Sequence, residues 1–150
     1  MNKEGLKRSG LNSVKNTFPL ADGEMEQAEI LRYHTQGTWV KMAVKNALHE
    51  PVNSQYAFSG DGQMAIIEMA NASGLAFIPP EKRNVMQSST FGTGELILNA
   101  VNRGVKEIIL GIGGSATNDG GIGMAAALGY QFLDKNGQIL EYNGSESFLH

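Results

Sequence analysis

The spacing of hydrophobic and polar positions changes several times along the chain, and each spacing predicts a different element. Helical spacing predicts a helix over residues 22–37 and a second helix from Thr93 to Arg103. Short runs of β-branched and aromatic residues predict four strands, which are Trp39–Val44, Val52–Phe58, Met64–Met69 and Lys106–Leu110. Strands follow one another in the first half of the chain and alternate with helices in the second half. This order favours an α/β fold with a mixed sheet and flanking helices.

Residues at the ends of these segments predict where helices and turns begin and end. Asp22 and Thr93 are the expected N-caps of the two helices, and Gly104 follows the second helix. The second helix is expected to bury a stripe of four apolar residues, which are Leu96, Ile97, Ala100 and Val101. Glycines in the segments 60–62 and 136–137 predict tight hairpin turns.

The segment from Ile108 to Gly129, IILGIGGSATNDGGIGMAAALG, is the most informative part of the sequence. Three β-favouring residues at its start predict a buried strand, which leads into a glycine-rich turn and then an Ala-rich helical stretch. A turn of this kind at a helix N-terminus directs several backbone N–H groups toward one place, where a phosphate can bind. Three polar side chains add further donors, and these are Ser115, Thr117 and Asn118. The pattern therefore favours an anion-binding loop over a plain turn that needs glycine only for its backbone angles.

Two known phosphate-binding patterns can be compared with this loop. It is not a Walker A loop, because no Gly-Lys-Ser/Thr sequence follows and the turn contains no lysine. Gly111, Gly113 and Ala116 do match a relaxed dinucleotide-binding pattern. Asp134 also follows at about the distance expected of an acid that binds ribose. A nicotinamide-binding module is therefore one interpretation of the loop.

Asp119 argues against a nicotinamide site and in favour of phosphoryl transfer. A carboxylate inside the loop repels a pyrophosphate unless a cation lies between them. Phosphoryl-transfer enzymes supply Mg²⁺ for this purpose, held by one or two carboxylates together with phosphate oxygens. Asp119 is thus a candidate Mg²⁺ ligand, and the alternative of equal weight is that it caps the helix beginning near Gly120.

Composition restricts the class of protein further. The chain of 150 residues has a net charge of −3, which argues against nucleic acid as its main partner. It contains no cysteine, so disulfides, thiolate metal sites and a cysteine nucleophile are excluded. No apolar run approaches the roughly 20 residues that span a membrane, and no signal-peptide pattern opens the sequence. We therefore expect a cytoplasmic protein with neither a membrane nor a nucleic-acid partner.

Five short segments together carry a resemblance to a known family. They are Pro19–Gly23, Gly60–Gly62, Ile67–Leu75, Ser89–Leu96 and Gly111–Gly121, of which the last is the most specific. These segments resemble an acidic-glycine motif, a hairpin, an acid-bearing strand end and two glycine motifs of the type 1 glycerate kinase family. Members of this family phosphorylate glycerate with ATP. The similarity is gap-free from about Trp39 to Tyr142.

The resemblance implies a fold and a set of ligands. Members of the family have a flavodoxin-like domain with a second α/β domain inserted into it, and the active site lies between them. The chain would then be a partial version of this two-domain fold. Residues 19–60 would be a remnant of the flavodoxin-like domain, and residues 61–150 would be part of the inserted domain. Residues 1–18 show no convincing hydrophobic period and would be poorly ordered. The implied ligands are ATP, Mg²⁺ and glycerate.

Chemistry and resemblance together assign roles to eight residues. The candidates for phosphate or substrate binding are Gly113, Gly114, Ser115, Thr117, Asn118 and Glu68, and the catalytic candidates are Asp119 and Asp22. Asp119 would hold Mg²⁺ or orient the attacking hydroxyl. Two of the acids have a structural alternative, because Asp22 could act as an N-cap and Glu68 could be a surface acid at a strand end.

Two functions of different classes remain open. One is a glycerate kinase-like phosphotransferase, which transfers the γ-phosphoryl group of ATP to a hydroxyl of glycerate. The other is a catalytically inactive fragment that binds a ligand or serves as a structural piece. The second arises because the C-terminal half of the family has no counterpart in this sequence. The sequence leaves the oligomeric state open.

Overall fold

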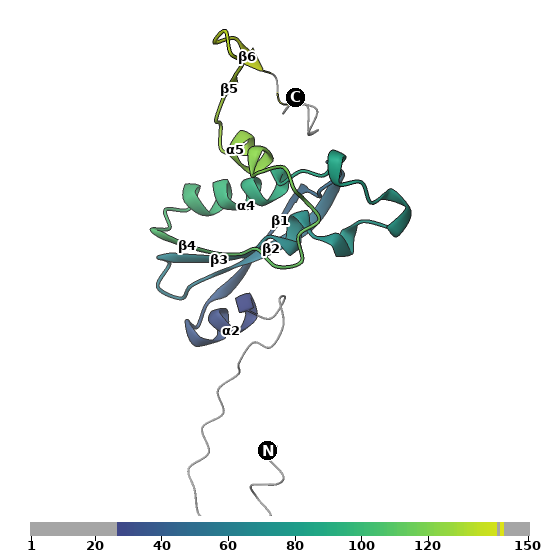
Figure 1. Cartoon of the computed structure of the whole chain (residues 1–150). Helices are drawn as coiled ribbons and strands as arrows, with labels where there is room; N and C mark the ends of the chain where they lie inside the picture. The colour runs from purple at the N-terminus through teal and green to yellow at the C-terminus, as the bar shows by residue number, and fades with distance from the viewer. Residues whose placement is uncertain (1–26, 141, 143–150) are drawn as a thin grey trace, which may run out of the picture.

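A computed structural model describes residues 27–140 and 142, around a four-stranded sheet in the order β1-β2-β3-β4 (Figure 1). The strands are β1 (Thr38–Lys45), β2 (Pro51–Phe58), β3 (Met64–Glu68) and β4 (Glu107–Gly111). β1 pairs antiparallel with β2 and β2 with β3, whereas β4 pairs parallel to β3. The predicted α/β class with a mixed sheet is confirmed, and each strand lies within one residue of its predicted bounds.

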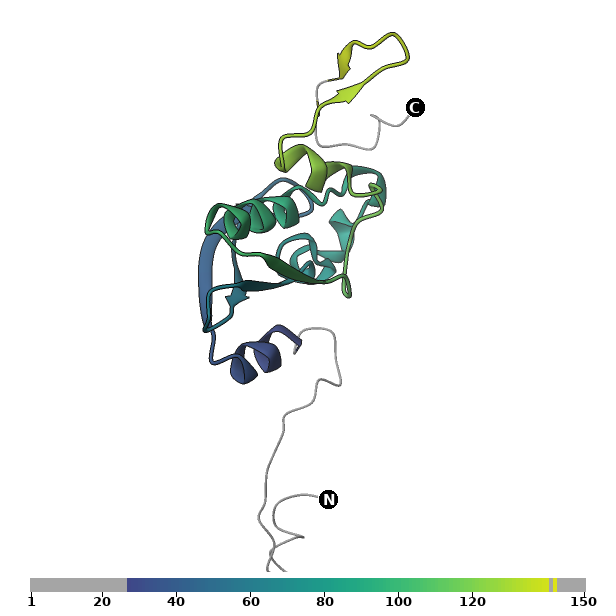
Figure 2. The same ribbon diagram turned by 90° about the vertical axis from the view of Figure 1, so that its left-hand side faces the viewer.

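Helices cover both faces of this sheet (Figures 1 and 2). α2 (Gln27–His34) lies on one face, and α4 (Phe91–Asn102) lies on the other with α5 (Ile122–Ala127) packed against it. The connection from β3 to α4 contains α3 (Ala70–Ser73) and the 3-10 turns η1 (Leu75–Phe77), η2 (Pro80–Lys82) and η3 (Val85–Gln87). A small hairpin of β5 (Phe132–Leu133) and β6 (Ile139–Leu140) projects beyond α5 (Figure 1).

The core consists of two apolar clusters, one on each face of the sheet. Successive residues of a strand point to opposite faces, so Tyr56 packs on the face that carries α4 and Ala57 on the other face. Leu96 of α4 completes the first cluster, and Ala28 of α2 completes the second. All four side chains are 1% exposed or less. The sheet is therefore held between helices, as the sequence predicts.

α4 begins earlier than the sequence predicts. Its N-cap is Thr90 rather than Thr93, so the prediction for Thr93 is wrong. The hydroxyl of Thr93 lies inside the helix, fully buried, and shares a hydrogen bond of 2.9 Å with Ser73. The predicted stripe is confirmed at Leu96 but wrong at Val101, which is 50% exposed on the outer side of the helix.

β4 is also less buried than the sequence predicts. Its run of Ile and Leu predicts a buried strand, but Ile108 is 36% exposed and Ile109 is 37% exposed. The prediction is wrong because β4 forms the edge of the sheet and has a neighbouring strand, β3, on one side alone within the described residues. A run of apolar residues indicates that a strand is suited to burial, but it does not show whether other described segments cover that strand.

The helix predicted over 22–37 is confirmed in part. Asp22 lies outside the described residues, and the described helix ends at His34. The chain turns here through Gln36, which has a left-handed φ of 52°. Gly37 is then needed for a close approach to β2, since an added Cβ would lie 2.3 Å from the carbonyl oxygen of Phe58.

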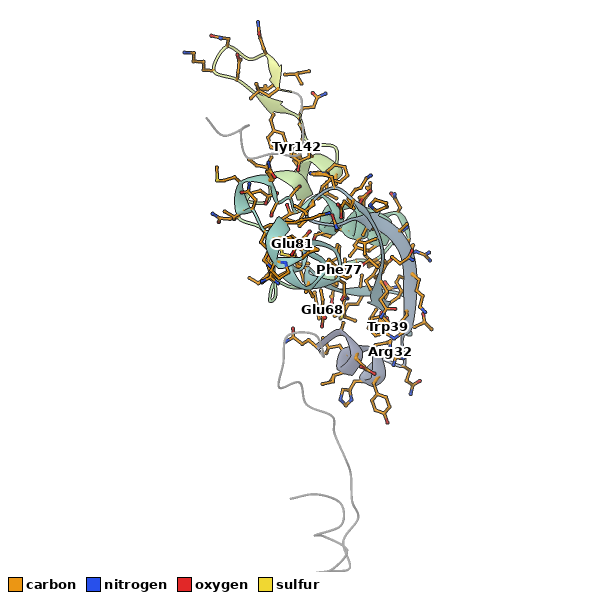
Figure 3. The ribbon with its side chains drawn as sticks, turned by 90° about the vertical axis from the view of Figure 1, so that its right-hand side faces the viewer. Arg32, Trp39, Glu68, Phe77, Glu81 and Tyr142 are labelled. Atoms are coloured by element: carbon orange, nitrogen blue, oxygen red, sulfur yellow. The ribbon has the colours of Figure 1, made fainter. Side chains whose placement is uncertain are left out.

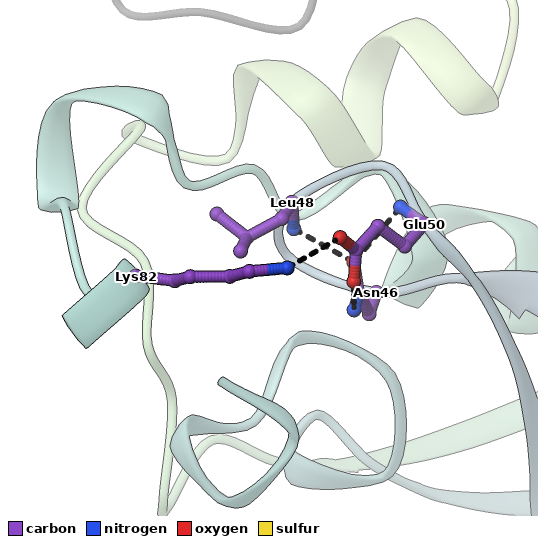
Figure 4. Close-up of polar contacts among 4 residues, drawn as sticks. All are labelled: Asn46, Leu48, Glu50 and Lys82. Carbon is purple, nitrogen blue, oxygen red and sulfur yellow. Dashed lines mark hydrogen bonds and ion pairs between the residues drawn. The ribbon is translucent and has the colours of Figure 1, made fainter. Parts of the chain in front are cut away.

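The turn between β1 and β2 is held by one asparagine and an ion pair (Figure 4). The Oδ1 atom of Asn46 accepts hydrogen bonds of 2.9 Å from the N–H groups of Leu48 and Glu50. Lys82 of η2 lies 3.3 Å from Glu50, and both side chains are more than half exposed, so this pair contributes little to stability. The hydrogen bond with Asn46 and the nearby Lys82 lower the pKa of Glu50.

One sheet spans the predicted boundary at residue 60. β1 and β2 come from residues 19–60, and they pair in the same sheet as β3 and β4 from residues 61–150. The predicted hairpin turns are both present, with left-handed glycines at Gly62 and Gly137. The division into 19–60 and 61–150 stays a prediction, and residues 1–18 lie outside the described residues.

Candidate functional site

A cavity of about 300 Å³ lies beside the glycine-rich loop that joins β4 to α5. The loop supplies most of its polar lining, namely Ser115, Thr117, Asn118, Asp119, Gly120 and Gly121. The rest comes from strand ends and helices, namely Met69, Thr90, Leu110, Ile112 and Met124. The cavity thus opens at the carboxyl ends of the parallel strands β3 and β4, which is where ligands bind in open α/β sheets.

The start of the loop is fixed to the segment after β3. The N–H of Leu75 donates to the carbonyl of Gly114 at 3.0 Å, and the N–H of Ala116 donates to the carbonyl of Ser73 at 2.9 Å. Within the loop, the Oγ of Ser115 accepts the N–H of Thr117 at 3.1 Å and lies 2.9 Å from its hydroxyl. These contacts hold the backbone of the loop in one conformation.

Several backbone N–H groups of the loop have no acceptor within the described part of the chain. They include those of Gly113, Gly114, Ser115, Asn118 and Gly120. Three of these residues, Ser115, Asn118 and Gly120, also line the cavity. Unpaired donors beside an open cavity are the requirement for anion binding, because an anion can satisfy them. Gly113 and Gly114 are not among the lining residues, so their predicted role has less support from the geometry.

Asp119 is buried and fully engaged by the protein. It is 6% exposed, and its two carboxylate oxygens accept from four donors at 2.8–3.1 Å, one of which, the hydroxyl of Thr90, lies within hydrogen-bond distance of both oxygens. The donors are the N–H and hydroxyl of Thr90 and the N–H groups of Gly121 and Gly123. Asp119 therefore caps the start of α5 and joins it to the start of α4, which is the structural alternative that the sequence allowed.

The hydrogen bonds of Asp119 also determine whether it can bind Mg²⁺. A carboxylate has about four lone-pair positions, and the contacts of Asp119 already fill them. Within residues 27–140 and 142, no group of three His, Asp or Glu side chains is placed to hold a metal ion. These contacts argue against Asp119 as a direct Mg²⁺ ligand, and its metal-binding role stays a prediction.

Glu68 lies at the carboxyl end of β3 and faces α2 (Figure 3). It is 3% exposed, so it is not the surface acid of the structural alternative. Its Oε1 accepts the N–H of Ala28 at 2.9 Å, which places a negative charge at the first turn of α2. Glu68 does not line the cavity beside the loop. Its predicted role in substrate binding stays a prediction, and its observed role is to fix α2.

Thr90 and Ser89 are site residues that the sequence analysis missed. Thr90 donates to Asp119 and also accepts the N–H of Met124 at 2.8 Å, so it connects α4, the loop and α5. The Oγ of Ser89 accepts the N–H of Phe91 at 3.0 Å and forms a short contact with the hydroxyl of Tyr142. The segment Ser89–Leu96 contains both residues, but the sequence pattern predicted Thr93 as the N-cap, so the role of Thr90 was not recognised.

Tyr142 lies over the start of α4 (Figure 3). Its ring stacks on Phe91 with centroids 5.8 Å apart and planes 7° apart, and His49 contacts both rings. Burial raises the pKa of the Tyr142 hydroxyl, its hydrogen bond with Ser89 lowers it, and the charge of Asp119 raises it. This aromatic cluster closes one side of the region that holds Asp119.

The structure does not place Asp134 where the nicotinamide interpretation needs an acid to bind ribose. The Oδ1 of Asp134 accepts the N–H groups of Asn136 and Gln138, both at 2.8 Å, in the turn of the β5–β6 hairpin. This hairpin is a separate two-stranded sheet, so Asp134 does not end a strand next to β4. The local hydrogen bonds also lower the pKa of Asp134.

No helix among the described residues is long and apolar enough to cross a membrane.

A second cavity of about 580 Å³ lies along β1 and β2 and was not predicted. Its lining includes Lys41, Asn53, Ser54, Asn71 and Phe77. Ser54 is 7% exposed, and its hydroxyl has no hydrogen-bond partner among the described residues.

Comparison with known proteins identifies the family. The sequence model of the Glycerate kinase family matches residues 1–148, a wider stretch than the Trp39–Tyr142 resemblance. Glycerate kinase of Haemophilus influenzae is 47% identical over 142 residues, which are 95% of this chain and 38% of that protein. Glycerate 2-kinase of Escherichia coli is 48% identical over 128 residues, 85% of this chain and 34% of that protein.

The fold agrees with a solved structure. A crystal structure described as glycerate kinase 2 from Salmonella typhimurium LT2 matches with a TM-score of 0.77 and 47% identity, over 82% of this chain and 33% of that chain. The chain thus spans about a third of the length of the relatives that it matches, as a partial fold. It belongs to the glycerate kinase family.

Proposed function

We propose that this chain contributes the anion-binding half of a glycerate kinase site. In that site, the γ-phosphoryl group of ATP is transferred to a hydroxyl of glycerate. The observation that carries the proposal is a set of loop N–H groups, at Ser115, Asn118 and Gly120, that have no acceptor among the described residues and lie beside a cavity of about 300 Å³. Membership of the family, and relatives named glycerate kinase, support the choice of reaction.

The loop has the chemistry that phosphoryl transfer requires. Catalysis of this reaction depends on positioning and on stabilising negative charge, and it needs little covalent chemistry from the protein. Fixed N–H donors stabilise charge without having to reorganise when it develops. The hydroxyl of Thr117 and the side chain of Asn118 add polar groups at the same wall of the cavity. ATP phosphate oxygens and the glycerate carboxylate are the ligands that fit these donors.

In this proposal Asp119 acts through the loop. Its contacts with four donors hold the turn that contains the N–H groups without an acceptor among the described residues. In a full-length relative, an Asp→Asn change at the matching position is expected to lower turnover by about 10²-fold, through the loss of roughly 3 kcal/mol of charge stabilisation. Turnover within a few-fold of the unchanged enzyme would refute this role.

The alternative is a piece that binds a ligand without catalysing transfer. It is favoured by one observation, namely that the chain spans 38% of its relative from Haemophilus influenzae. A coupled assay of ADP release from ATP with D-glycerate and Mg²⁺ separates the two. Turnover that requires D-glycerate supports the kinase. Absence of turnover in a folded, monodisperse chain that still binds ATP supports the alternative.

A further inference from the structure

The hydroxyl of Tyr142 contacts a buried serine at the start of α4 (Figure 3). This serine is Ser89, which is 1% exposed. The ring of Tyr142 is already held by stacking on Phe91 and by contact with His49. A phenylalanine ring would make the same ring contacts, so they do not explain why a hydroxyl is present.

Ser89 lies in the turn that opens α4, and its side chain organises that turn. Its Oγ accepts the N–H of Phe91 at 3.0 Å, and its own N–H donates to the carbonyl of Ala47 at 2.9 Å. A hydroxyl has one donor and two acceptor positions, so a second partner fixes its rotation. The contact with Tyr142 therefore fixes the side chain that holds the first turn of α4.

The same turn holds the glycine-rich loop. Thr90, which lies between Ser89 and Phe91, donates its N–H and its hydroxyl to Asp119. The packing leaves no free space here, because a Cβ added at Gly123 would lie 2.2 Å from Ser89 Oγ and 2.8 Å from Asp119 Oδ2. A movement of Ser89 would therefore displace the groups that hold Asp119 and the start of α5.

We propose that Tyr142 is a positioning residue for the anion-binding loop. Through Ser89 and Thr90, its hydroxyl holds the loop N–H groups in the arrangement that binds an anion. Tyr142 is not among the residues that line the cavity, so it acts on the loop without touching the ligand. The inference rests on the proposed function, because the role assigned to Tyr142 is exerted on the anion site of that function.

The test compares ATP binding with and without the hydroxyl. The ¹⁵N-labelled 150-residue chain is titrated with ATP, and the amide signals of Ser115, Asn118 and Gly120 report on the loop. Tyr142→Phe keeps the stacked ring and removes the hydrogen bond. It should keep the fold by circular dichroism and weaken ATP binding about three- to tenfold, the effect expected for the loss of one hydrogen bond.

Two matched variants control for the loss of a hydroxyl elsewhere. Ser88→Ala removes a buried hydroxyl that donates to the carbonyl of Asn84, away from the loop. Tyr130→Phe removes a phenol hydroxyl from a side chain that is 69% exposed. Each control should leave the affinity for ATP within about twofold of the wild-type value.

A double-mutant cycle separates positioning from unrelated structural damage. Ser89→Ala removes the same hydrogen bond from its other side, and should weaken ATP binding at least as much as Tyr142→Phe. Adding Tyr142→Phe to Ser89→Ala should then weaken binding by less than about twofold more, because both changes act on one contact. In the wild-type chain, the ¹³Cζ signal of Tyr142 should shift with ATP at the same Kd as the loop amides, because coupling between two sites is reciprocal.

The outcomes separate this inference from the proposed function. Equal ATP affinity of the wild-type chain and a folded Tyr142→Phe variant would overturn the inference and leave the proposed function standing. Effects of Tyr142→Phe and Ser89→Ala that multiply would also overturn it. If Tyr142→Phe is unfolded, Ser89→Ala is compared with Ser88→Ala, and equal affinities of these two would overturn the inference. Loop amides of the wild-type chain that do not respond to ATP would overturn the proposed function, and the inference with it.

Discussion

Replacing Asp119 by asparagine tests the claim that this carboxylate holds the loop. The change keeps the size of the side chain but turns one acceptor oxygen into an NH₂ donor. Each oxygen of Asp119 accepts from a backbone N–H of the α5 start, Gly121 on Oδ1 and Gly123 on Oδ2. Either orientation of the new amide therefore leaves a backbone N–H facing another donor, the part-buried N–H of Gly121 or the buried N–H of Gly123.

The cost can be worked from these contacts. One unpaired buried N–H costs about 1–3 kcal/mol, and the loss of charge assistance in the remaining bonds adds about 1 kcal/mol. The free energy of unfolding should therefore fall by about 2–4 kcal/mol. For a chain of this size the midpoint of thermal unfolding should fall by roughly 4–16 °C, at about 2–4 °C per kcal/mol.

The assay is urea and thermal unfolding followed by circular dichroism. Asp134→Asn is the matched control, since Asp134 also accepts backbone N–H groups, but in the exposed turn of the β5–β6 hairpin. Water can replace those bonds, and the control should cost less than about 1 kcal/mol. A loss at Asp119→Asn no larger than at Asp134→Asn would refute the reasoning.

Three further predictions follow from packing, charge and titration. Gly92→Ala should prevent or severely weaken folding, because the added Cβ would lie 1.7 Å from a carbonyl oxygen of β1. Gly104→Ala is the control, since its Cβ would enter open space, and it should lower the free energy of unfolding by about 1 kcal/mol because of its left-handed φ of 86°. Urea unfolding measures both. Glu68→Ala should increase hydrogen exchange in the first turn of α2, because it removes the acceptor of that turn, and unchanged exchange would contradict this. The pKa of Tyr142 is raised in the folded state, so its contribution to stability should be complete below about pH 10 and be lost as the pH rises through the folded pKa. Ser89→Ala should raise the pKa of Tyr142 further in an ultraviolet titration, since the hydrogen bond lowers it; a fall would oppose this account.

The strands, the hairpin turns and the glycine-rich turn could be predicted because their signals are local. β-branched runs, Asn-Gly at a turn and glycine after a helix each act within a few residues. The link from Thr90 to Asp119 could not be predicted in this way, because it joins residues 29 positions apart and has no spacing rule. Thr93 was the better N-cap by local pattern, and the long-range bonds to Asp119 placed the cap at Thr90 instead.

The exposure of β4 was outside the reach of the sequence for a different reason. Ile108, Ile109 and Leu110 have the composition of a buried strand, and burial depends on what lies beside it in the folded molecule. In the candidate site, too, local sequence predicts one part and the folded surroundings determine the other. The sequence located the loop and its donors, but it could not tell which N–H groups the protein itself would satisfy.

The central claim is that the loop N–H groups with no acceptor in the described part of the chain bind an anion. An NMR titration of the ¹⁵N-labelled chain with ATP tests this claim most directly. The account predicts saturable shifts of the Ser115, Asn118 and Gly120 amide signals, with a Kd near 1 mM or below, which corresponds to about 4 kcal/mol of binding free energy. Signals of the β5–β6 hairpin should not move, and sodium chloride at equal ionic strength should not reproduce the shifts. Loop signals that stay in place up to about 10 mM ATP, a concentration some tenfold above that Kd, would contradict the claim.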